Sequence, residues 1–301
     1  MNNDNQNYPL ITIGVSAYNR KNYLPECLDS LLQQTYPRCE IIVVDDGSTD
    51  GTDELMQEKY PQIKYIRKEN GGDASAKNLA AKNASGEYIV FNDSDDIFFP
   101  DAVERLYNAL QDKGKDACSY GTYQTIDANG KILPTKRKVS NLPSGNITSD
   151  LLRHIIVNSC GTLMPLAVFS DCGSFNDKLR VSHDWALFLE MSLNHNFYAV
   201  QEPVFYRRRH GNNISSASYG KIQILLNVFE DFTSKHQKTL APYSLVIKKR
   251  LADLHRKLYR EAKKEKLYQQ AFEHAAMTWK LNHSVKNLCS MAAAAAAKWI
   301  H

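Results

Sequence analysis

The sequence contains no long hydrophobic run: no stretch of its 301 residues approaches the roughly 20 consecutive apolar residues that a membrane-spanning helix needs. The amino-terminal segment MNNDNQNYP also lacks the basic flank and apolar core of a secretory signal. Hydrophobic residues make up 43% of the chain and charged residues 23%, which argues against a collagenous, coiled-coil or disordered protein. We therefore expect a globular, cytoplasmic protein.

Cysteines are few and scattered. They lie at Cys27, Cys39, Cys118, Cys160, Cys172 and Cys289, with no CxxC pair and no histidine at the spacing of a zinc ligand. In a chain of this length the pattern argues against a disulfide framework and predicts reduced, structural thiols.

Basic residues are in excess only near the carboxyl terminus. The formal net charge is +4, yet residues 241–301 alone hold twelve Lys and Arg against four Asp and Glu. The rest of the chain is therefore net acidic. This distribution predicts no nucleic-acid partner and instead indicates a local partner surface on the carboxyl-terminal segment.

Short apolar runs alternate with helical patterns over the first hundred residues. Such alternation predicts βαβ units and an α/β fold, with a Rossmann-like, mainly parallel sheet flanked by helices. From Lys221 onward the pattern is helical throughout, which predicts a carboxyl-terminal helical extension. The expected strands are 10–15, 40–44, 63–67, 87–91, 117–126, 131–133 and 199–206; the expected helices are 21–34, 50–59, 74–84 and 183–194.

Polar clusters follow three of the first four expected strands. They are Tyr18-Asn19, Asp45-Asp46 and Asp93 to Asp96. Because ligands of such sheets gather beyond the carboxyl ends of the strands, these clusters predict a binding site there.

The densest cluster is Asn92-Asp93-Ser94-Asp95-Asp96. Carboxylates this close repel one another unless a cation lies among them, and hard oxygen ligands favour Mg²⁺ or Mn²⁺ with phosphate oxygens completing the shell. The alternative is a helix N-cap, because Pro100-Asp101 starts a helix nearby. Asp45 to Thr52 likewise fits either a nucleotide contact or an ordinary turn.

The order of these motifs resembles one family closely, the inverting family 2 glycosyltransferases of the GT-A fold. The resemblance is strong over residues 9–110, weaker to about 215 and absent beyond. Its matching segments are Val15 to Arg20, Ile41 to Thr52, Asn70-Gly71-Gly72 through Lys77-Asn78, and Gly86 to Ile89 leading into Asp93 to Asp96.

The resemblance implies a set of donor-binding and metal-binding residues. Asp95 is the expected direct ligand of Mn²⁺ or Mg²⁺, with Asp93 beside it and His210 as a further contact. Lys77 stands where the family usually has Arg, so we expect it to hold a phosphate as a point charge. The expected donor contacts are Ala17, Tyr18, Asn19, Arg20, Asp45, Asp46, Gly71, Lys77, Asp93, Ser94, Arg207 and Arg209.

A general base is expected at Asp184. An acceptor hydroxyl is a poor nucleophile, so a carboxylate has to take its proton. His183-Asp184-Trp185 resembles the family segment that ends in Glu-Asp, with His183 in place of the Glu. The alternative for Asp184 is a helix N-cap. The basic segment Tyr206 to Ser215 fits either a diphosphate contact or a solvated loop.

The resemblance implies a domain layout and an activity. Residues 1–8 are expected to be a disordered tail, 9–220 a GT-A catalytic domain with halves 9–110 and 111–220, and 221–301 a basic helical extension. The expected activity is inverting transfer of a sugar from a nucleotide-diphosphate donor, UDP-linked by preference, to a carbohydrate or lipid-linked acceptor in bacterial surface polysaccharide or glycolipid synthesis. The alternatives are a non-catalytic nucleotide-sugar-binding homologue and a metal-dependent sugar nucleotidyltransferase, although the glycine-rich loop expected of the latter is missing after the first strand.

Two interpretations of the basic extension stay open. Its lysines and arginines could line a surface that contacts the inner face of the membrane, which would suit a lipid-linked acceptor. They could instead be solvated, on helices that pack as a cap or against a second copy of the chain in a homo-oligomer.

Overall fold

The computed structural model describes residues 8–134, 141–211 and 218–300. The chain divides into two compact units, one of residues 1–148 with 156–213 and one of residues 149–155 with 214–301. We name them the α/β unit and the helical unit. The expected disordered tail, residues 1–8, lies outside the described residues except for Tyr8.

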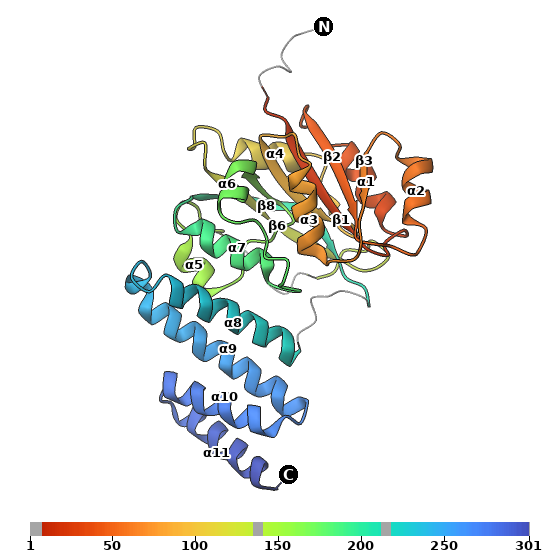
Figure 1. The fold of residues 1–301 in the computed structure, drawn as a ribbon. Coiled ribbons are helices and arrows are strands. Elements are labelled where there is room, and N and C mark those ends of the chain that lie inside the picture. Colours follow the sequence, from red (N-terminus) through yellow and green to blue (C-terminus); the bar gives the residue numbers. More distant parts are fainter. Residues whose placement is uncertain (1–7, 135–140, 212–217, 301) are drawn as a thin grey trace. The chain divides into compact units, whose positions relative to one another are not determined.

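The α/β unit is built on an eight-stranded sheet in the order β3-β2-β1-β4-β7-β6-β8-β5 (Figure 1). The four strands from β3 to β4 are parallel, β7 is antiparallel to both of its neighbours, and β6 and β8 are parallel. The expectation of a mainly parallel α/β sheet is thus confirmed. The strands are β1 (Ile11–Ala17), β2 (Cys39–Asp45), β3 (Lys64–Arg67), β4 (Tyr88–Asp93), β5 (Ile97–Phe98), β6 (Cys118–Ile126), β7 (Thr162–Pro165) and β8 (Phe197–Arg208).

The strand expected at 131–133 is wrong. Ile132 forms only an isolated bridge with Ile126. The carboxylate of Asp127 accepts the N–H groups of Asn129 and Lys131, each at 2.9 Å, and thereby folds the segment into a tight turn.

Helices cover both faces of the sheet. Ile13 and Val15 of β1 share a core with α1 (Leu24–Leu32), α2 (Thr52–Lys59) and α4 (Ala102–Asn108). Gly14 of β1 faces the opposite side, where a Cβ would lie 3.1 Å from the Cβ of Ala80 in α3. Only glycine lets α3 approach the sheet this closely. The other helices of the α/β unit, which do not contribute to that core, are α3 (Asp73–Lys82), α6 (Leu166–Asp171) and α7 (His183–Ser192).

Parallel pairing brings the expected polar clusters to one edge of the sheet. Ala17 at the end of β1 pairs with Asp45 at the end of β2, and Ser16 pairs with Asp93 at the end of β4. The predicted meeting of the strand ends is therefore confirmed.

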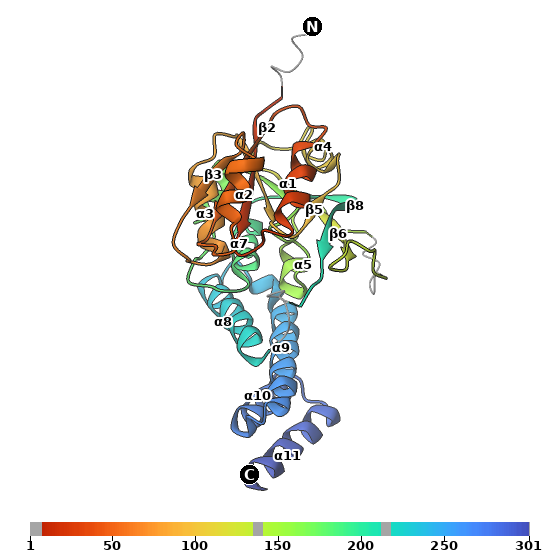
Figure 2. The same ribbon diagram turned by 90° about the vertical axis from the view of Figure 1, so that its right-hand side faces the viewer.

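The helical unit consists of successive helices, of which α9, α10 and α11 pack in chain order (Figure 2). The apolar side of α9 is used in this packing, since Leu254, Leu258 and Ala262 are buried. Within the described residues, no helix has both the length and the apolar character needed to cross a membrane. The helices are α5 (Thr148–Arg153), α8 (Tyr219–Lys235), α9 (Ser244–Lys264), α10 (Tyr268–Leu281) and α11 (Val285–Ile300).

Candidate active site

The first strand-end loop presents one exposed aromatic ring. Tyr18 is 48% exposed, whereas Ala17 before it is buried. Asn19 has a φ of 52°, and its backbone N–H donates to Ser48 Oγ at 2.9 Å while its Oδ1 accepts the N–H of Thr49 at 2.8 Å. The first two loops are thus tied together, and Tyr18 stands beside them with its ring accessible to a ligand.

Asp45 is buried and hydrogen-bonded both within its own loop and to the neighbouring strand β3. Its Oδ1 accepts the N–H of Ser48 at 2.8 Å and its Oδ2 accepts the hydroxyl of Tyr65 at 2.6 Å. In this arrangement Asp45 shapes the loop after β2, and each of its oxygens keeps one further acceptor site.

Asp46 fixes the glycine turn before α3. Its Oδ1 accepts the N–H of Gly71 at 2.8 Å and the ammonium of Lys68 at 2.7 Å, and its Oδ2 accepts the N–H of Gly72 at 2.7 Å. Gly72 has a φ of 94°, and a Cβ there would lie 3.2 Å from Nη1 of Arg180. The turn therefore requires glycine, and it lies next to a cation that sequence reasoning missed.

The acidic loop after β4 brings Asp95 to the side chains of Arg20 and His210. Its Oδ2 lies 2.7 Å from Nε2 of His210 and 3.7 Å from Nε of Arg20. The ring of His210 stacks on Tyr23, with ring centroids 5.0 Å apart. The structure thus brings together Arg20, Asp95 and His210, three of the residues that the resemblance assigned to the donor and the metal.

The other members of the acidic loop point inward. Ser94 and Asp96 are buried, and Asp96 Oδ1 accepts the N–H of Arg208 at 2.9 Å. Burial, followed by the negative charges of Asp93 and Asp95, raises the pKa of Asp96 well above its ordinary value. Asp96 therefore holds the loop against β8 and is not placed as a ligand.

Asp93 is held by a buried lysine. Lys77 is 2% exposed, and its Nζ donates to Asp93 at 2.7 Å, to Asp73 at 2.9 Å and to Ser159 at 3.1 Å. Burial lowers the pKa of Lys77, but Asp73 and Asp93 outweigh that effect and raise it above its ordinary value. A direct contact between Lys77 and a donor phosphate would require one of these carboxylates to release it first.

Asp73 is shared by three side chains. It accepts the hydroxyl of Ser16 and the ammonium of Lys77, and its Oδ2 lies 3.2 Å from Nε2 of His183. Desolvation raises the pKa of Asp73, yet Lys77 and then His183 outweigh it and hold the pKa well below its ordinary range. A chain of contacts therefore runs from Asp93 through Lys77 and Asp73 to His183.

His183 is the last residue in this series of contacts, and one of its ring nitrogens makes no hydrogen bond within the described residues. Its ring packs edge-on against Phe175, and its buried Nδ1 has no hydrogen-bond partner among the residues that the structure describes. A buried polar atom without a partner costs stability, which fits a position whose partner arrives with a ligand.

Asp184 lies in the first turn of α7. The N-cap position belongs to Ser182, whose φ of 64° turns the chain sharply into the helix. Asp184 Oδ1 accepts the N–H of Trp185 at 2.8 Å, and the side chain is half-buried. Asp184 is therefore not the N-cap residue, and it directly follows His183, which contacts Asp73.

The three consecutive arginines of β8 and its end have different surroundings. Arg207 is half-buried, with its guanidinium 5.2 Å from the ring centroid of Tyr123, and Arg209 is exposed. Arg208 points to the other side and is 2% exposed. This alternation is what an extended segment imposes.

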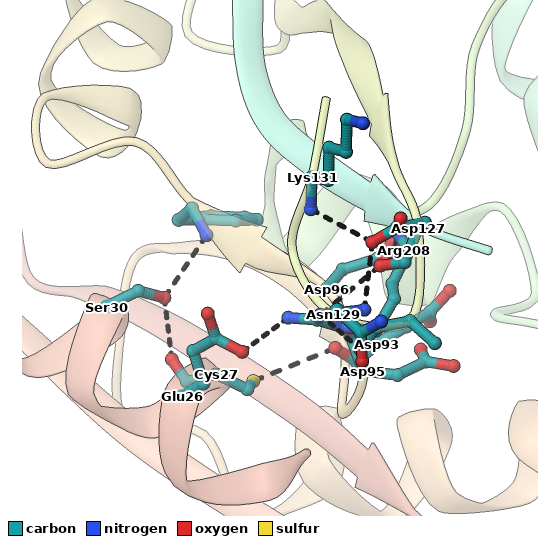
Figure 3. A network of polar contacts seen from close by, with 12 residues as sticks. Glu26, Cys27, Ser30, Asp93, Asp95, Asp96, Asp127, Asn129, Lys131 and Arg208 are labelled. Carbon is teal, nitrogen blue, oxygen red and sulfur yellow. Dashed lines mark hydrogen bonds and ion pairs between the residues drawn. The ribbon is translucent and has the colours of Figure 1, made fainter. Parts of the chain in front are cut away.

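Arg208 ties three segments together around the acidic loop (Figure 3). Its guanidinium donates to the carbonyl oxygens of Asp95 at 3.0 Å and Ala128 at 3.1 Å, and to the carboxylate of Glu26. Arg208 thus positions the loop that carries Asp95.

The side chains fit a metal ion that is shared with a ligand. Among the described residues, no three His, Cys, Asp or Glu side chains are grouped so as to hold a metal by themselves. Ligand atoms of one octahedral ion at ~2.1 Å lie roughly 3 Å apart, and Asp95 Oδ2 and His210 Nε2 have nearly this separation at 2.7 Å. Mg²⁺ and ions like it usually take one or two protein ligands and complete their shell with phosphates and water, so this pair is a suitable partial site.

Sequence reasoning missed Asp73, Ser159, Arg180 and Arg208. Asp73 had a detectable signal, since it lies four residues before Lys77, directly before the expected helix 74–84, and can pair with it. Ser159 and Arg180 had no detectable signal in the sequence, because the residues that they contact, Lys77 and Gly72, lie far away along the chain.

Comparison with known proteins identifies the class. The model of glycosyl transferase family 2 matches residues 12–170, slightly more than half of the chain. The chain therefore belongs to glycosyl transferase family 2. An uncharacterized glycosyltransferase of Rickettsia prowazekii is 30% identical over 233 residues, which cover 76% of this chain and 73% of the relative. Other curated relatives, among them uncharacterized glycosyltransferases of Rickettsia felis and Rickettsia conorii, are longer, and the chain spans about a third of their length.

Two solved structures share the fold. TarS 1–349 of S. aureus, in complex with UDP-GlcNAc, has a TM-score of 0.61 at 16% identity, covering 90% of this chain and 89% of that one. The mannosyltransferase PcManGT of Pyrobaculum calidifontis, in complex with GDP-Man and Mn²⁺, has a TM-score of 0.61 at 20% identity, covering 97% and 81%. The fold is thus that of GT-A glycosyltransferases, as expected.

Proposed function

We propose that this protein is an inverting glycosyltransferase that moves a sugar from a UDP-linked donor to a hydroxyl group of a carbohydrate or lipid-linked acceptor. The observation that carries the proposal is the trio of Arg20, Asp95 and His210 at the carboxyl edge of the sheet, in a chain of family 2. The likeness to TarS in complex with UDP-GlcNAc and to PcManGT in complex with GDP-Man and Mn²⁺ supports a nucleotide-sugar as the donor.

The donor is assigned to the strand-end loops. The exposed ring of Tyr18 offers a face on which a base can stack. Arg20 and the half-buried Arg207 supply positive charge for the diphosphate. Asp95 and His210 would hold Mn²⁺ or Mg²⁺ together with the diphosphate, and the bound ion would supply charge neutralisation for the leaving group.

Asp184 is assigned as the base. Its carboxylate takes the proton of the acceptor hydroxyl while the hydroxyl oxygen bonds to the anomeric carbon and the bond from that carbon to the diphosphate oxygen breaks. One displacement of this kind inverts the anomeric centre. His183, fixed by Asp73, orients the first turn of α7, and Lys77 compensates the charges of Asp73 and Asp93.

The test is a calorimetric titration of UDP with and without Mn²⁺, on the native protein and on Asp95→Ala. We expect metal-dependent binding that weakens at least about a hundredfold in the variant, because a charge-neutralising ligand is lost. Asp116→Ala is the matched control, since that aspartate is exposed and lies beside His195, which belongs to neither the donor nor the metal site.

A parallel titration of GDP distinguishes the nucleotide. Tighter binding of GDP than of UDP would replace the UDP assignment and leave the enzyme class intact. Binding of neither nucleotide, or binding indifferent to both Mn²⁺ and Asp95, would overturn the proposal in favour of a non-catalytic homologue.

A further inference from the structure

The helical unit contains a hollow lined by three of its helices. It has an empty volume of about 370 Å³, part of which opens to solvent. α9 contributes Arg256, Tyr259 and Arg260; α10 contributes Ala275 and Thr278; α11 contributes Lys286, Asn287 and Ser290. All eight side chains belong to one compact unit, so the hollow is a feature of that unit alone.

Helical periodicity explains why cations gather here. Arg256 and Arg260 are one turn apart and share a face of α9, whereas Leu254 and Leu258 pack into the interior. On α10 the lining includes Ala275, which is buried and whose small side chain occupies little of the space between the helices.

The lining carries three positive charges and no carboxylate. Arg256 has one distant acidic contact, 3.8 Å from Asp253, which Lys257 approaches more closely at 3.0 Å. No ion pair to Arg260 or to Lys286 exists within the described part of the chain. Like charges that converge on a hollow repel one another, and an anion placed among them removes that repulsion.

The available donors define the anion. The hydroxyls of Thr278 and Ser290 already donate to the backbone carbonyls of His274 and Lys286. The remaining donors are two guanidinium groups, one ammonium, the hydroxyl of Tyr259 and the second amide hydrogen of Asn287, whose first is bonded to Asn282. Arginine forks match phosphate oxygens, and a phosphomonoester carries about −1.5 to −2 charges, which suits three cations better than a single carboxylate does.

We propose that the hollow between α9, α10 and α11 is a phosphate-binding site, separate from the donor site and built by Arg256, Arg260 and Lys286. The phosphate can belong to a soluble phosphorylated molecule or to a lipid headgroup, and the same three cations recognise both. The site gives the basic extension a defined ligand in place of a diffuse positive surface.

The test uses inorganic phosphate, titrated calorimetrically into the full chain at low ionic strength with EDTA present. We compare the native protein with Arg256→Gln/Arg260→Gln and with the matched control Lys248→Gln/Lys249→Gln. Each variant loses two positive charges on α9, glutamine keeps the helix propensity, and Lys248 and Lys249 are exposed residues outside the hollow. Circular dichroism verifies that each variant is folded.

We expect saturable binding of one phosphate, weakened at least about tenfold in the arginine variant because two charge-assisted contacts are lost. In the lysine control we expect less than about a twofold change. Equal weakening in both variants would mean unspecific charge attraction and would overturn the site, as would the absence of binding to the native protein. Binding of UDP with Mn²⁺ is measured in parallel and remains unchanged, so the two sites are judged separately.

Vesicles separate the two sources of phosphate. Sedimentation is measured with phosphatidylcholine alone and with phosphatidylcholine that contains one-fifth phosphatidic acid. Binding to phosphatidic acid that disappears in the arginine variant assigns the site to a lipid headgroup. Binding of inorganic phosphate without binding to these vesicles assigns it to a soluble phosphorylated molecule.

Discussion

The candidate active site of the α/β unit pairs its acidic side chains with neighbours in the fold, whereas the hollow of the helical unit is lined by cations without a carboxylate. At the carboxyl edge of the sheet, Asp93 contacts Lys77, and Asp95 contacts His210 and Arg20. The hollow of the helical unit is lined by Arg260 and Lys286, both exposed, and by no carboxylate. One region therefore compensates its charges from within the fold, whereas the cations of the other are exposed to solvent.

The difference has a physical consequence for each region. Internal pairs hold side chains in fixed positions before a ligand arrives, which is what a reaction centre needs. Unpaired cations keep their attraction for an external anion, which is what a binding site needs. Three substitutions in the α/β unit test which of its charged residues are needed for catalysis and which stabilise the fold. They are given in order of the expected effect, from the largest to the smallest.

The largest effect is expected for Asp184→Asn. The amide cannot accept the acceptor's proton, so we expect the rate of UDP release from the preferred UDP-sugar to fall about a thousandfold, equivalent to ~4 kcal/mol in the barrier. UDP binding should change less than about twofold. Asp177→Asn, at an exposed aspartate before α7, is the control and keeps the native rate. If Asp184→Asn kept the native rate, the assignment of Asp184 as the general base would be wrong.

The second substitution, Lys77→Met, removes the ion pairs that Lys77 makes with two carboxylates. It leaves Asp73 and Asp93 without their cation, and we expect the free energy of unfolding to fall by about 3 kcal/mol at pH 7. The lowered pKa of Asp73 means that its contribution is present above about pH 4 and is lost as pH falls below that value. The deficit should therefore shrink on acidification.

Urea denaturation from pH 7 to pH 3, in EDTA, measures this dependence. Lys82→Met, at an exposed position near the end of the same helix, is the control, with a change within about 0.5 kcal/mol. A deficit that stays constant down to pH 3 would mean that Lys77 stabilises the fold by packing and not through these carboxylates.

A smaller effect is expected from Arg208→Met. It removes donors to Glu26 and to two loops, so unfolding should become easier by about 2 kcal/mol. The adjacent Arg209→Met, at an exposed position, should change stability by less than about 0.5 kcal/mol. Thermal denaturation of the pair measures the contrast, and equal effects would contradict the separate burial of the two arginines.

Much of the α/β unit follows from local pattern. The expected strands at 40–44 and 87–91 are confirmed as β2 (Cys39–Asp45) and β4 (Tyr88–Asp93), and the helix at 183–194 as α7. Buried parallel strands form nearly continuous apolar runs that end in polar residues, so both their position and their ends are visible in the sequence. The short β5 (Ile97–Phe98) and β7 (Thr162–Pro165) escaped detection because two to four residues carry no period.

The candidate site was predictable only in part. Asp95 and His210 were identified through the resemblance, and the structure brings them within 2.7 Å of each other. The position of Lys77 was not foreseen, because its partner Ser159 lies 82 residues further along the chain. No local period reports a contact over such a distance.

By itself the sequence determined the longer strands and helices of the first hundred residues, which polar residues follow those strands, and that the basic excess lies at the carboxyl terminus. These properties depend on side chains within a few residues of one another, and hydrophobic periodicity and turn chemistry express them directly. Only the tertiary structure decided that Asp73 joins Lys77 to His183, that Arg208 and not Arg207 or Arg209 is buried, and that three helices place their cations around one hollow. Those outcomes depend on which distant segments pack together, and packing assigns each charged side chain either a partner within the protein or a place open to a ligand.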